Sequence, residues 1–479
     1  MNTRPRGSRR VVASAAIACA VAAVVAPSTV LAGSIEYLSN QSAEYVRTFS
    51  RNASTDAIDI ISYNPAGLTF LGKDGLYLNL SLQSVIKRFS MKYEGVELSS
   101  TTPTPVLPSF FAAYKWRNLV GFASFSVPAG GGSVDYDEGV HFLRPLVLKA
   151  IDPSTNAVPD CKPAEPICTP MSGQFSGASA MFGITGGVAY KFFDMISISA
   201  AGRVVIGRKS YVGSVTYGGV RAALDATKHA VGFGGIFGVH IRPFKRYLDI
   251  GFRFETPTPL TWKTTSTTEN LKTGTIDPGG PNDGLPESAL WTFANGAEEK
   301  RSLPATIGIG LAFHPPILTN LTISASLNVY LIKAADSYHD CANAVTADGT
   351  GCPADTNPNT ATGFVRGYDD DYSNGIDLGI SAEYKLNKWI LVSLAYNRGI
   401  VGSNEKTLND FEIVLDSNTI GGGLRVDIGD RLQINAGAAA VFYKSAQNSA
   451  LNFLPVFNTP ETFDRFSLVL TLGAQYRLF

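Results

Sequence analysis

The sequence predicts an all-β fold: a 14-stranded antiparallel transmembrane β-barrel with an N-terminal plug, or hatch, segment. Three observations predict the barrel. Apolar and polar residues alternate strictly over many segments of the chain. The connections between these stretches are short turns and long polar segments in regular exchange. After the first 32 residues, no apolar run reaches the roughly 18 residues that a membrane-spanning helix needs.

The first 32 residues have the features of a secretory signal peptide. Residues 1–10 carry four arginines, residues 11–26 are apolar, and Val30-Leu31-Ala32 is a small-residue cleavage site. An uncleaved anchor and lipoprotein processing at Cys19 are the alternatives, although the apolar run is short and the residues before Cys19 fit a lipobox poorly. We therefore expect three parts: a signal peptide (1–32), a hatch in the periplasm or lumen (33–74) and the barrel (75–479).

The strand predictions depend on a period of two residues. The clearest examples are LYLNLSLQ (76–83), LTISASLNVY (321–330), RLQINAGAAAVF (431–442) and FSLVLTLGAQYRL (466–478). In the first of these, the four leucines occupy one face, while Asn79, Ser81 and Gln83 occupy the other. Because successive side chains of a strand point to opposite faces, such segments have one apolar and one polar side.

The number of strands follows from the connections. Six short turns recur at residues 114–122, 190–198, 240–250, 313–323, 384–392 and 426–434. Seven longer segments rich in Gly, Pro, Asn, Asp, Ser and Thr centre on residues 87–105, 129–175, 208–228, 256–302, 333–374, 399–418 and 446–464. Thirteen connections require fourteen strands, an even number as in bacterial outer-membrane barrels. A soluble β-sandwich would also alternate, but it does not predict this regular exchange of short and long connections.

Composition and motifs exclude several classes of function. The 40 basic and 40 acidic residues cancel, so the basic surplus expected of a nucleic-acid-binding protein is missing. The five histidines form no metal-binding spacing and no GxSxG elbow occurs, so we predict no metal, no cofactor and no catalytic residues. The run Asp369–Asp371 could bind calcium, but a solvated loop tip or a cation bridge to lipopolysaccharide is the favoured interpretation.

Four cysteines follow the predicted signal peptide, in two close pairs. Cys161 lies near Cys168, and Cys341 lies near Cys352, both within long polar segments. Export to an oxidising compartment and this spacing predict two local disulfides. Zinc binding is the weaker alternative, because neither pair has CxxC spacing.

The segment SNQSAEYVRTFSRNASTDAIDIISYNPAGLTFL (39–71) resembles the N-terminal segment of the FadL/TodX family of outer-membrane transporters for long-chain fatty acids and aromatic hydrocarbons. The residues that carry the resemblance are Ser42, Ala43, Ala53, Asp56, Ala57, Asn64, Pro65, Ala66, Gly67 and Leu68. The resemblance implies that this segment forms a hatch inside a fourteen-stranded barrel, with Asn64, Pro65, Ala66 and Gly67 as its gating corner. A simple turn before the first strand is the alternative, because Pro at this position also favours a turn.

The resemblance also implies a function: plug-gated diffusion of hydrophobic small molecules across the outer membrane, with lateral release at a kinked third strand. The candidates for the kink are Pro128, Gly130, Gly131 and Gly132, because proline removes a ladder donor and glycine weakens a strand. They could equally begin the long segment that follows. The expected partners are a hydrophobic ligand, outer-membrane lipid and lipopolysaccharide, with the chain acting as a monomer. A weakly selective porin and a surface adhesin barrel are the alternative functions.

Overall fold

The computed structural model describes seven stretches of the chain. They are residues 42–141 without 94, 172–217, 220–244, 247–266, 295–340 without 336, 372–448 without 406, 409, 411 and 412, and 460–479. The predicted signal peptide, the four cysteines predicted to pair and Asp369–Asp371 lie outside the described residues.

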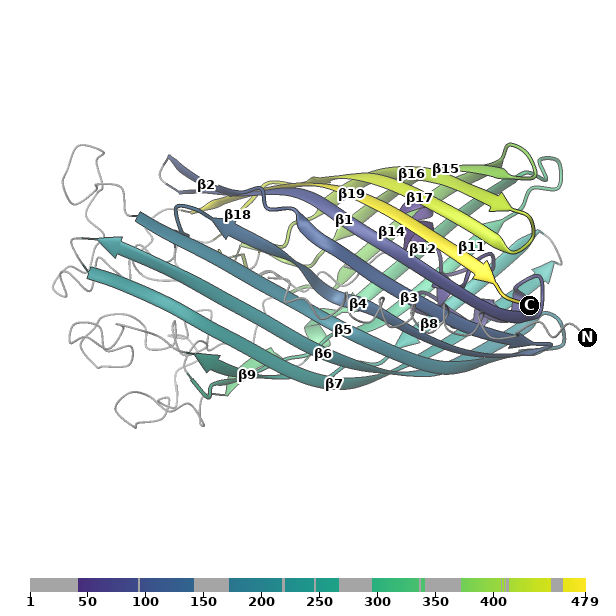
Figure 1. Ribbon diagram of the computed structural model, residues 1–479, viewed down its shortest axis with the longest axis horizontal. Helices are drawn as coiled ribbons and strands as arrows, with labels where there is room; N and C mark the ends of the chain where they lie inside the picture. The colour runs from purple at the N-terminus through teal and green to yellow at the C-terminus, as the bar shows by residue number, and fades with distance from the viewer. Residues whose placement is uncertain are drawn as a thin grey trace, which may run out of the picture.

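One antiparallel sheet forms a closed wall (Figure 1). Its strands are β1 (Gly75–Tyr93), β2 (Val96–Ser100), β3 (Thr104–Trp116), β4 (Leu119–Tyr136), β5 (Ser172–Phe192), β6 (Ile196–Tyr217), β7 (Val220–Phe244), β8 (Leu248–Glu255), β9 (Thr261–Ser266), β10 (Glu298–Arg301), β11 (Ala305–Phe313), β12 (Leu321–Leu331), β13 (Ser337–Asp340), β14 (Gly375–Lys385), β15 (Ile390–Ile400), β16 (Ser417–Ile428), β17 (Leu432–Tyr443), β18 (Ala446–Gln447) and β19 (Thr462–Arg477). The first and last strands close the sheet, with Tyr77 opposite Arg477 and Lys92 opposite Thr462. A single copy of the chain therefore completes the barrel.

The wall has fourteen successive strand positions, and some of these positions are filled by two strands that follow one another. The strand β9 continues β8, β10 leads into β11, and β13 follows β12, while β2 and β18 are short additions beside β1 and β19. The predicted fourteen-stranded antiparallel barrel is confirmed. The interruption between β8 and β9 is local, since Thr258 still bridges to Leu303 before the ladder resumes.

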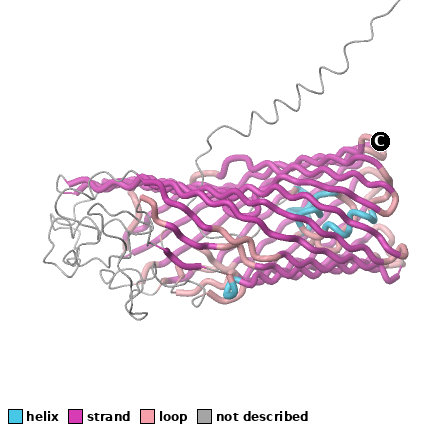
Figure 2. Tube along the Cα trace, turned by 90° about the horizontal axis from the view of Figure 1, so that it is seen from below, coloured by secondary structure: helices cyan, strands magenta, loops and turns pink. Residues whose placement is uncertain are grey.

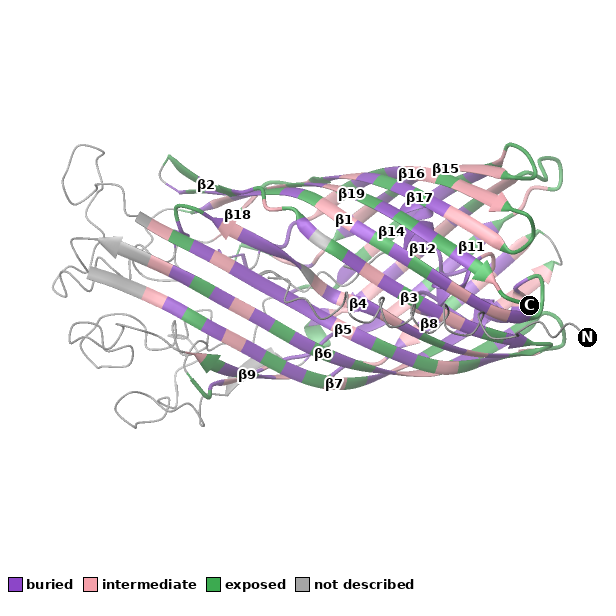
Figure 3. Cartoon of the chain, viewed as in Figure 1, coloured by how far each residue is buried: buried purple, intermediate pink, exposed green. Residues whose placement is uncertain are grey.

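Burial alternates along the wall strands, as the period of two predicts (Figure 3). On β1, Leu80 and Leu82 point outward and are exposed, whereas Asn79 and Ser81 point into the lumen and are buried. On the outer surface near the short turns, exposed aromatic side chains include Trp116, Tyr190, Phe313, Tyr384, Trp389 and Tyr476. An apolar outer band with aromatic residues near its edge is the surface of a barrel embedded in lipid, and it places this protein in a bacterial outer membrane.

The connections agree with the prediction on one rim and differ on the other. All six predicted short turns join consecutive wall strands, for example at Arg117-Asn118 between β3 and β4. The prediction of a long connecting segment at 208–228 is wrong, because β6 and β7 pair continuously as far as Tyr217 opposite Val220. The alternation of side chains simply continues there, although the residues become more polar than in the membrane-spanning part.

The N-terminal segment, residues 42–71, lies inside the barrel (Figure 2). It contains one α-helix, α2 (Ala43–Thr48), and two 3-10 helices, η1 (Ile58–Ser62) and η2 (Pro65–Phe70). A further 3-10 turn, η4 (Ile332–Ala334), follows β12. Among the described residues, no helix is long and apolar enough to cross a membrane.

Apolar contacts anchor the N-terminal segment on two sides of the lumen. On one side, Ile58, Ile60 and Ile61 pack with Leu68 and with wall residues such as Phe111. On the other side, Tyr45, Val46, Phe49 and Tyr63 pack against Ala395, Ala439, Val441 and Val469. The isoleucines of η1 thus obtain the burial that their apolar side chains require.

Candidate functional site

Asn64 fixes the corner between η1 and η2. Its side-chain oxygen accepts a hydrogen bond from the Ala66 N–H (3.3 Å), which caps the start of η2. Its amide nitrogen donates to the carbonyl oxygens of Asn52 (2.8 Å) and of Val239 on β7 (3.1 Å). Pro65 follows at the first position of η2. A backbone N–H at this position has no partner within the helix, so the missing N–H of proline costs no hydrogen bond. One side chain therefore ties the corner both to its own segment and to the barrel wall.

Gly67 is required by close packing at this corner. A Cβ atom at this position would lie 2.6 Å from the carbonyl oxygen of Ser54 and 3.0 Å from Cδ1 of Ile60. Both contacts are shorter than normal van der Waals distances, so any larger residue would push η2 away from η1. The four corner residues predicted from the sequence, Asn64 to Gly67, thus lie together and buried in the lumen.

Buried ion pairs hold the N-terminal segment in its own shape. The Arg51 guanidinium contacts both oxygens of Asp59, with Nη2–Oδ1 at 2.5 Å and Nε–Oδ2 at 3.0 Å, and also Asp56 Oδ1 at 2.8 Å. The Ser42 hydroxyl donates to Asp59 Oδ2 (2.7 Å). Burial by itself would raise the pKa of Asp56, but the charges of Arg51, Arg425 and Arg47 outweigh burial and lower it well below its usual value.

Two further ion pairs join the segment to the wall. Asp56 Oδ2 accepts from Arg425 Nη1 on β16 (2.9 Å). Arg47, fully buried, pairs with Glu383 on β14. Breaking one partner of such a buried pair leaves an uncompensated charge, so these contacts resist displacement of the segment.

Glu44 on α2 is a buried acid with two amide partners. Asn79 on β1 and Asn435 on β17 donate to its Oε1, at 2.7 and 3.0 Å. Burial, together with repulsion from Asp59, raises the pKa of Glu44 to about 7, against the opposing charge of Arg51. The charge of this group therefore changes near neutral pH.

Glycines on the inner wall make room for the N-terminal segment. We call this set the glycine seat: Gly238, Gly251, Gly308, Gly310, Gly379, Gly421, Gly423, Gly437 and Gly473. A Cβ atom at Gly251 would lie 1.8 Å from the Asn52 carbonyl oxygen, and one at Gly379 would lie 2.0 Å from that of Phe49. The backbone of the segment thus approaches the backbone of the wall more closely than any side chain would allow.

The end of η2 is clamped by the side chains of Arg242 and His240. The Phe70 ring lies 4.6 Å from the Arg242 guanidinium and 4.9 Å from the His240 ring. Asp249 on β8 holds both partners, since its Oδ1 lies 2.7 Å from His240 Nε2 and accepts from Arg242 Nε at 2.7 Å. This clamp fixes the last turn of the segment just before the first wall strand.

The wall is not fully paired between β3 and β4. These strands pair from Trp116 opposite Leu119 to Phe110 opposite Phe125, and no further within the described ladder. Both strands continue beyond this point, β3 back to Thr104 and β4 on to Tyr136. Beyond the pair Phe110–Phe125 the two strands separate, so the remainder of each strand is not paired with the other in this ladder.

The residues predicted to kink the third strand lie at this parting. The β4–β5 register shifts between Ser126 and Ala129, across Pro128, and again between Gly130 and Gly132, across Gly131. Gly130 has φ = 71°, a left-handed conformation that favours glycine. The alternative that these residues begin a long loop is wrong, because β4 continues through them to Tyr136.

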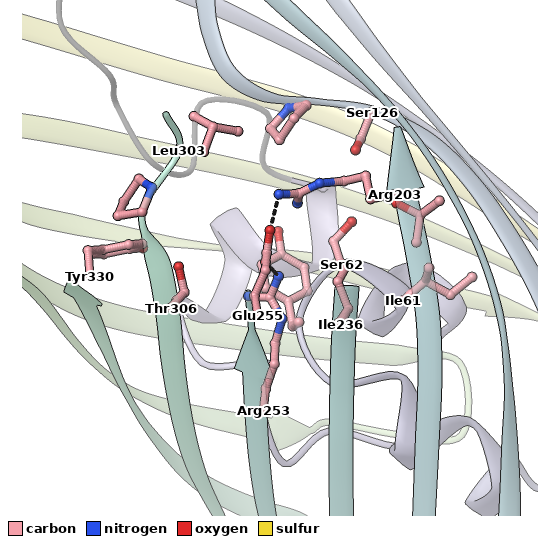
Figure 4. A pocket seen from close by; sticks show the side chains of 14 residues that line it. Ile61, Ser62, Ser126, Arg203, Ile236, Arg253, Glu255, Leu303, Thr306 and Tyr330 are labelled. Atoms are coloured by element: carbon pink, nitrogen blue, oxygen red, sulfur yellow. Dashed lines mark hydrogen bonds and ion pairs between the residues drawn. The ribbon is translucent and has the colours of Figure 1, made fainter. Parts of the chain in front are cut away.

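A polar cavity of about 50 Å³ lies beside the bulged part of β4 and above the N-terminal segment (Figure 4). Its lining residues are Ile61, Ser62, Tyr63, Ser126, Pro128, Thr185, Arg203, Ile236, Arg253, Glu255, Leu303, Pro304, Thr306 and Tyr330. Within it, the Glu255 carboxylate pairs with both Arg203 and Arg253. All three side chains are buried, at 5–8% exposed.

These charged residues were not predicted as a site, although the sequence contains a signal for them. In IGFRFETP (250–257), Arg253 and Glu255 alternate with the outward-facing Phe252 and Phe254, so both charges must point into the lumen. Arg203 on β6 reaches the same place only because the sheet brings β6 and β8 to either side of β7. Among the described residues, no group of three His, Cys, Asp or Glu side chains is placed to hold a metal ion.

Comparison with known proteins identifies the fold. No protein-family model matches the sequence, and no curated protein sequence matches it. Solved structures do match over almost the whole chain. A FadL homologue from Pseudomonas aeruginosa is 14% identical, with 93% of this chain and 100% of that chain covered and a TM-score of 0.61.

Two toluene transporters match similarly. TodX from Pseudomonas putida is 13% identical, with coverages of 93% and 99% and a TM-score of 0.59. TbuX from Ralstonia pickettii is 14% identical, with coverages of 94% and 99% and a TM-score of 0.57. Identities this low establish the architecture rather than a shared substrate. The chain has the fold of the FadL/TodX barrels, as its N-terminal segment led us to expect.

Proposed function

We propose that this protein is an outer-membrane channel through which hydrophobic small molecules enter the cell by diffusion. The observation that carries the proposal is the combination of a filled lumen and an incompletely paired wall. Residues 42–71 occupy the lumen through buried ion pairs and close backbone contacts, while β3 and β4 part beside a cavity. Two of the solved structures with the same fold are of proteins named as toluene transporters, which supports a hydrophobic substrate.

In this proposal, residues 33–74 act as a hatch. The corner Asn64–Gly67 is its rigid element, and the described part from residue 42 is held by contacts to several wall strands. Ions and sugars would be kept out while the hatch is in place. A ligand would need to loosen only some of these contacts to alter the passage, and a concentration gradient would be sufficient to drive transport.

The exit we propose lies in the wall, between β3 and β4. Ser126 and Pro128 line the cavity and also belong to the part of β4 that does not pair with β3. An apolar molecule leaving there would enter the lipid directly and would avoid the aqueous compartment. The register shifts across Pro128 and Gly131 support this route, because such bulges disrupt the ladder locally and bend the strand that carries them.

Uptake by liposomes containing the purified protein tests the function. We expect accumulation of a long-chain fatty acid or toluene, with negligible permeation of sugars. Rapid sugar permeation through the intact protein would contradict the proposal and would favour the weakly selective porin. Binding of matrix molecules without any uptake would favour the adhesin instead.

Closing the wall tests the proposed exit. The register between β3 and β4, if continued one step, would place Ser109 opposite Ser126, and both face the lumen. We expect that Ser109→Cys with Ser126→Cys, joined by a short thiol-reactive linker, abolishes hydrophobic uptake and that cleaving the linker restores it. The matched control is Ser324→Cys with Ser381→Cys, because these serines already face each other in the β12–β14 ladder. Unchanged uptake in the linked β3–β4 variant would rule out this exit.

A further inference from the structure

The outer face of β6 and β7 carries an apolar band with a sharp upper edge (Figure 3). The outward-facing residues from Ile196 to Ile206 on β6, and from Val231 to Ile241 on β7, are all apolar or glycine. Both stretches cover the same height, because Ile196 lies opposite Ile241 and Ile206 lies opposite Val231. A tilted strand of about 9–11 residues spans the hydrocarbon of a bilayer. Because the short turn before Ile196 marks the periplasmic end, the pair Ile206–Val231 lies at the outer edge of the membrane.

Three basic side chains occupy the outward-facing positions at and just beyond this edge. Arg208 lies opposite His229 in the β6–β7 ladder, and His229 lies opposite Lys263 in the β7–β9 ladder. All three side chains are exposed on the outer face of the wall. Neighbouring strands are about 4.8 Å apart, so the three positions span about 10 Å. We call Arg208, His229 and Lys263 the basic row.

The charge of the basic row is only partly neutralised by the protein. Among the described residues, neither Arg208 nor His229 has a side-chain hydrogen bond or ion pair, whereas Lys263 pairs with Glu298 at 2.7 Å. The comparable residue on β1 is Arg88, which is the next outward-facing residue after Ile86.

Arg88 differs from the basic row in having an acidic partner, since its Nη2 lies 3.0 Å from Glu97 Oε1. An isolated ion pair of this kind leaves no net charge at that point of the surface. The basic row, by contrast, keeps at least one positive charge in excess, directed at the head-group layer of the outer leaflet.

The chemistry of the basic row suits a phosphate group above acyl chains. An arginine guanidinium matches the oxygens of a phosphate with two parallel N–H donors, and a lysine ammonium adds a point charge. An imidazole can donate an N–H in either protonation state, so His229 contributes a donor with or without a charge. Directly below the row, Val231 and Phe233 are among the most exposed apolar side chains of the wall, at 68% and 65%.

We propose that the basic row binds a phosphate group of lipopolysaccharide, whose acyl chains lie along Ile206, Val231 and Phe233. Lipopolysaccharide carries phosphates on a sugar backbone directly above its acyl chains, which is the same vertical order as the basic row and the apolar band. The inference goes beyond the proposed function, because it assigns a resident lipid to the outer wall and does not depend on what passes through the lumen. Glu298 competes with the phosphate for Lys263.

Substitutions should change lipid binding in opposite directions. Arg208→Gln should weaken binding about fivefold, and Arg208→Gln combined with Lys263→Gln should weaken it about thirtyfold, because each cation near a lipid surface contributes similarly. Glu298→Gln removes the competitor of Lys263 and should strengthen binding about two- to fivefold. If these charges only stabilised the wall, no substitution among them would strengthen binding.

The experiment measures binding of diphosphoryl lipid A to the purified full-length protein in an uncharged detergent by native mass spectrometry. We expect it to bind at least about tenfold more tightly than the same lipid A without its phosphates, and more tightly than phosphatidylglycerol. Inorganic phosphate at equal concentration should not compete, because it makes no contact with the apolar band.

Arg88→Gln is the matched control, since Arg88 lies at the same height above the apolar band but already pairs with Glu97. We expect this variant to bind diphosphoryl lipid A within about twofold of the wild type, the range of a lost surface ion pair. Folding of every variant is checked by its heat-dependent migration in gel electrophoresis.

Four results would overturn the inference. They are equal binding of lipid A with and without phosphates, unchanged binding by the double variant Arg208→Gln with Lys263→Gln, weaker binding by folded Glu298→Gln, and binding of phosphatidylglycerol as tight as that of diphosphoryl lipid A. The last result would mean that the row is a general surface for anionic lipids. Hydrophobic uptake into phospholipid liposomes should be the same for the wild type and the double variant, so failure of this inference is distinguishable from failure of the proposed function.

Discussion

At the scale of single residues, the lumen depends on a few side chains that make several contacts each. Asn64 joins η2, Asn52 and the wall strand β7 through three hydrogen bonds. Arg51 holds Asp56 and Asp59 together, and Asp56 in turn reaches Arg425. Asn64, Arg51 and Asp59 are fully buried, which means that a partner lost from any of them cannot be replaced by bulk water.

Asn64→Ala should loosen the hatch without preventing barrel assembly. The substitution removes the cap of η2 and leaves the carbonyls of Asn52 and Val239 without this donor, at a cost of about 1–3 kcal/mol. We expect roughly tenfold more frequent ion-conducting openings in planar bilayers. Asn387→Ala is the control, since Asn387 also caps backbone N–H groups but lies in an exposed turn. Identical conductance of wild type and Asn64→Ala would mean that the corner is only a turn.

Glu44 should make the hatch sensitive to pH. Its pKa is raised from 4.5 to about 7 in the folded protein, so the folded state binds more protons than the unfolded state between these values. The stabilisation is complete below pH 4.5 and is lost as the pH rises through about 7, a difference of at most about 3 kcal/mol.

We therefore expect ion conductance of the wild type to increase between pH 5 and pH 8. Glu44→Gln keeps the shape of the protonated acid and should flatten this increase, with low conductance at pH 8. Titration of Asp56 lies outside this range, because its pKa is lowered rather than raised. A wild-type conductance that falls over the same pH range would contradict this assignment.

At the scale of elements, the hatch and the wall are in contact through their backbones. The glycine seat lets α2 and the turn after it lie directly on the inner face of the barrel. The strands that carry these glycines are otherwise ordinary wall strands with alternating faces. Glycine inside a strand weakens it, so its placement here points to the close approach of another backbone.

Gly379→Val should displace the hatch, because Phe49 O already lies 2.0 Å from the position of a Cβ atom. We expect a folded barrel with increased ion conductance and faster proteolysis of the N-terminal segment. The control is Gly121→Val on β4, where a Cβ atom would meet nothing within 4 Å. Normal conductance of Gly379→Val would show that the segment can shift without opening a passage.

At the scale of the whole molecule, the barrel is complete without the hatch. The β1–β19 ladder closes the wall, and the seam is extended by a hydrogen bond from the Leu478 N–H to the Leu76 carbonyl oxygen (2.8 Å). The described part of the hatch, from residue 42 onward, contacts the wall from inside and contributes no strand to it. Closure of the barrel and occupation of the lumen are thus separate structural features.

Removal of residues 42–71 should therefore leave a folded barrel with an open pore. We expect heat-dependent migration like that of the wild type, together with a large, steady ion conductance and rapid permeation of sugars. Failure of the shortened chain to assemble would show instead that the hatch is needed for folding. Assembly with low conductance would mean that other parts of the chain also close the lumen.

The sequence by itself determined the barrel. Alternation with a period of two specifies both strand faces, and the six short turns together with the seven longer segments specify the number of strands, because these are local properties of the chain. The corner Asn64–Gly67 was also recognisable locally. Tertiary structure decided what the lumen contains: Arg47 meets Glu383 336 residues away, and Arg203 meets Glu255 across β7. Such contacts depend on the register of a closed sheet, and no local pattern records which inward-facing residues that closure brings together.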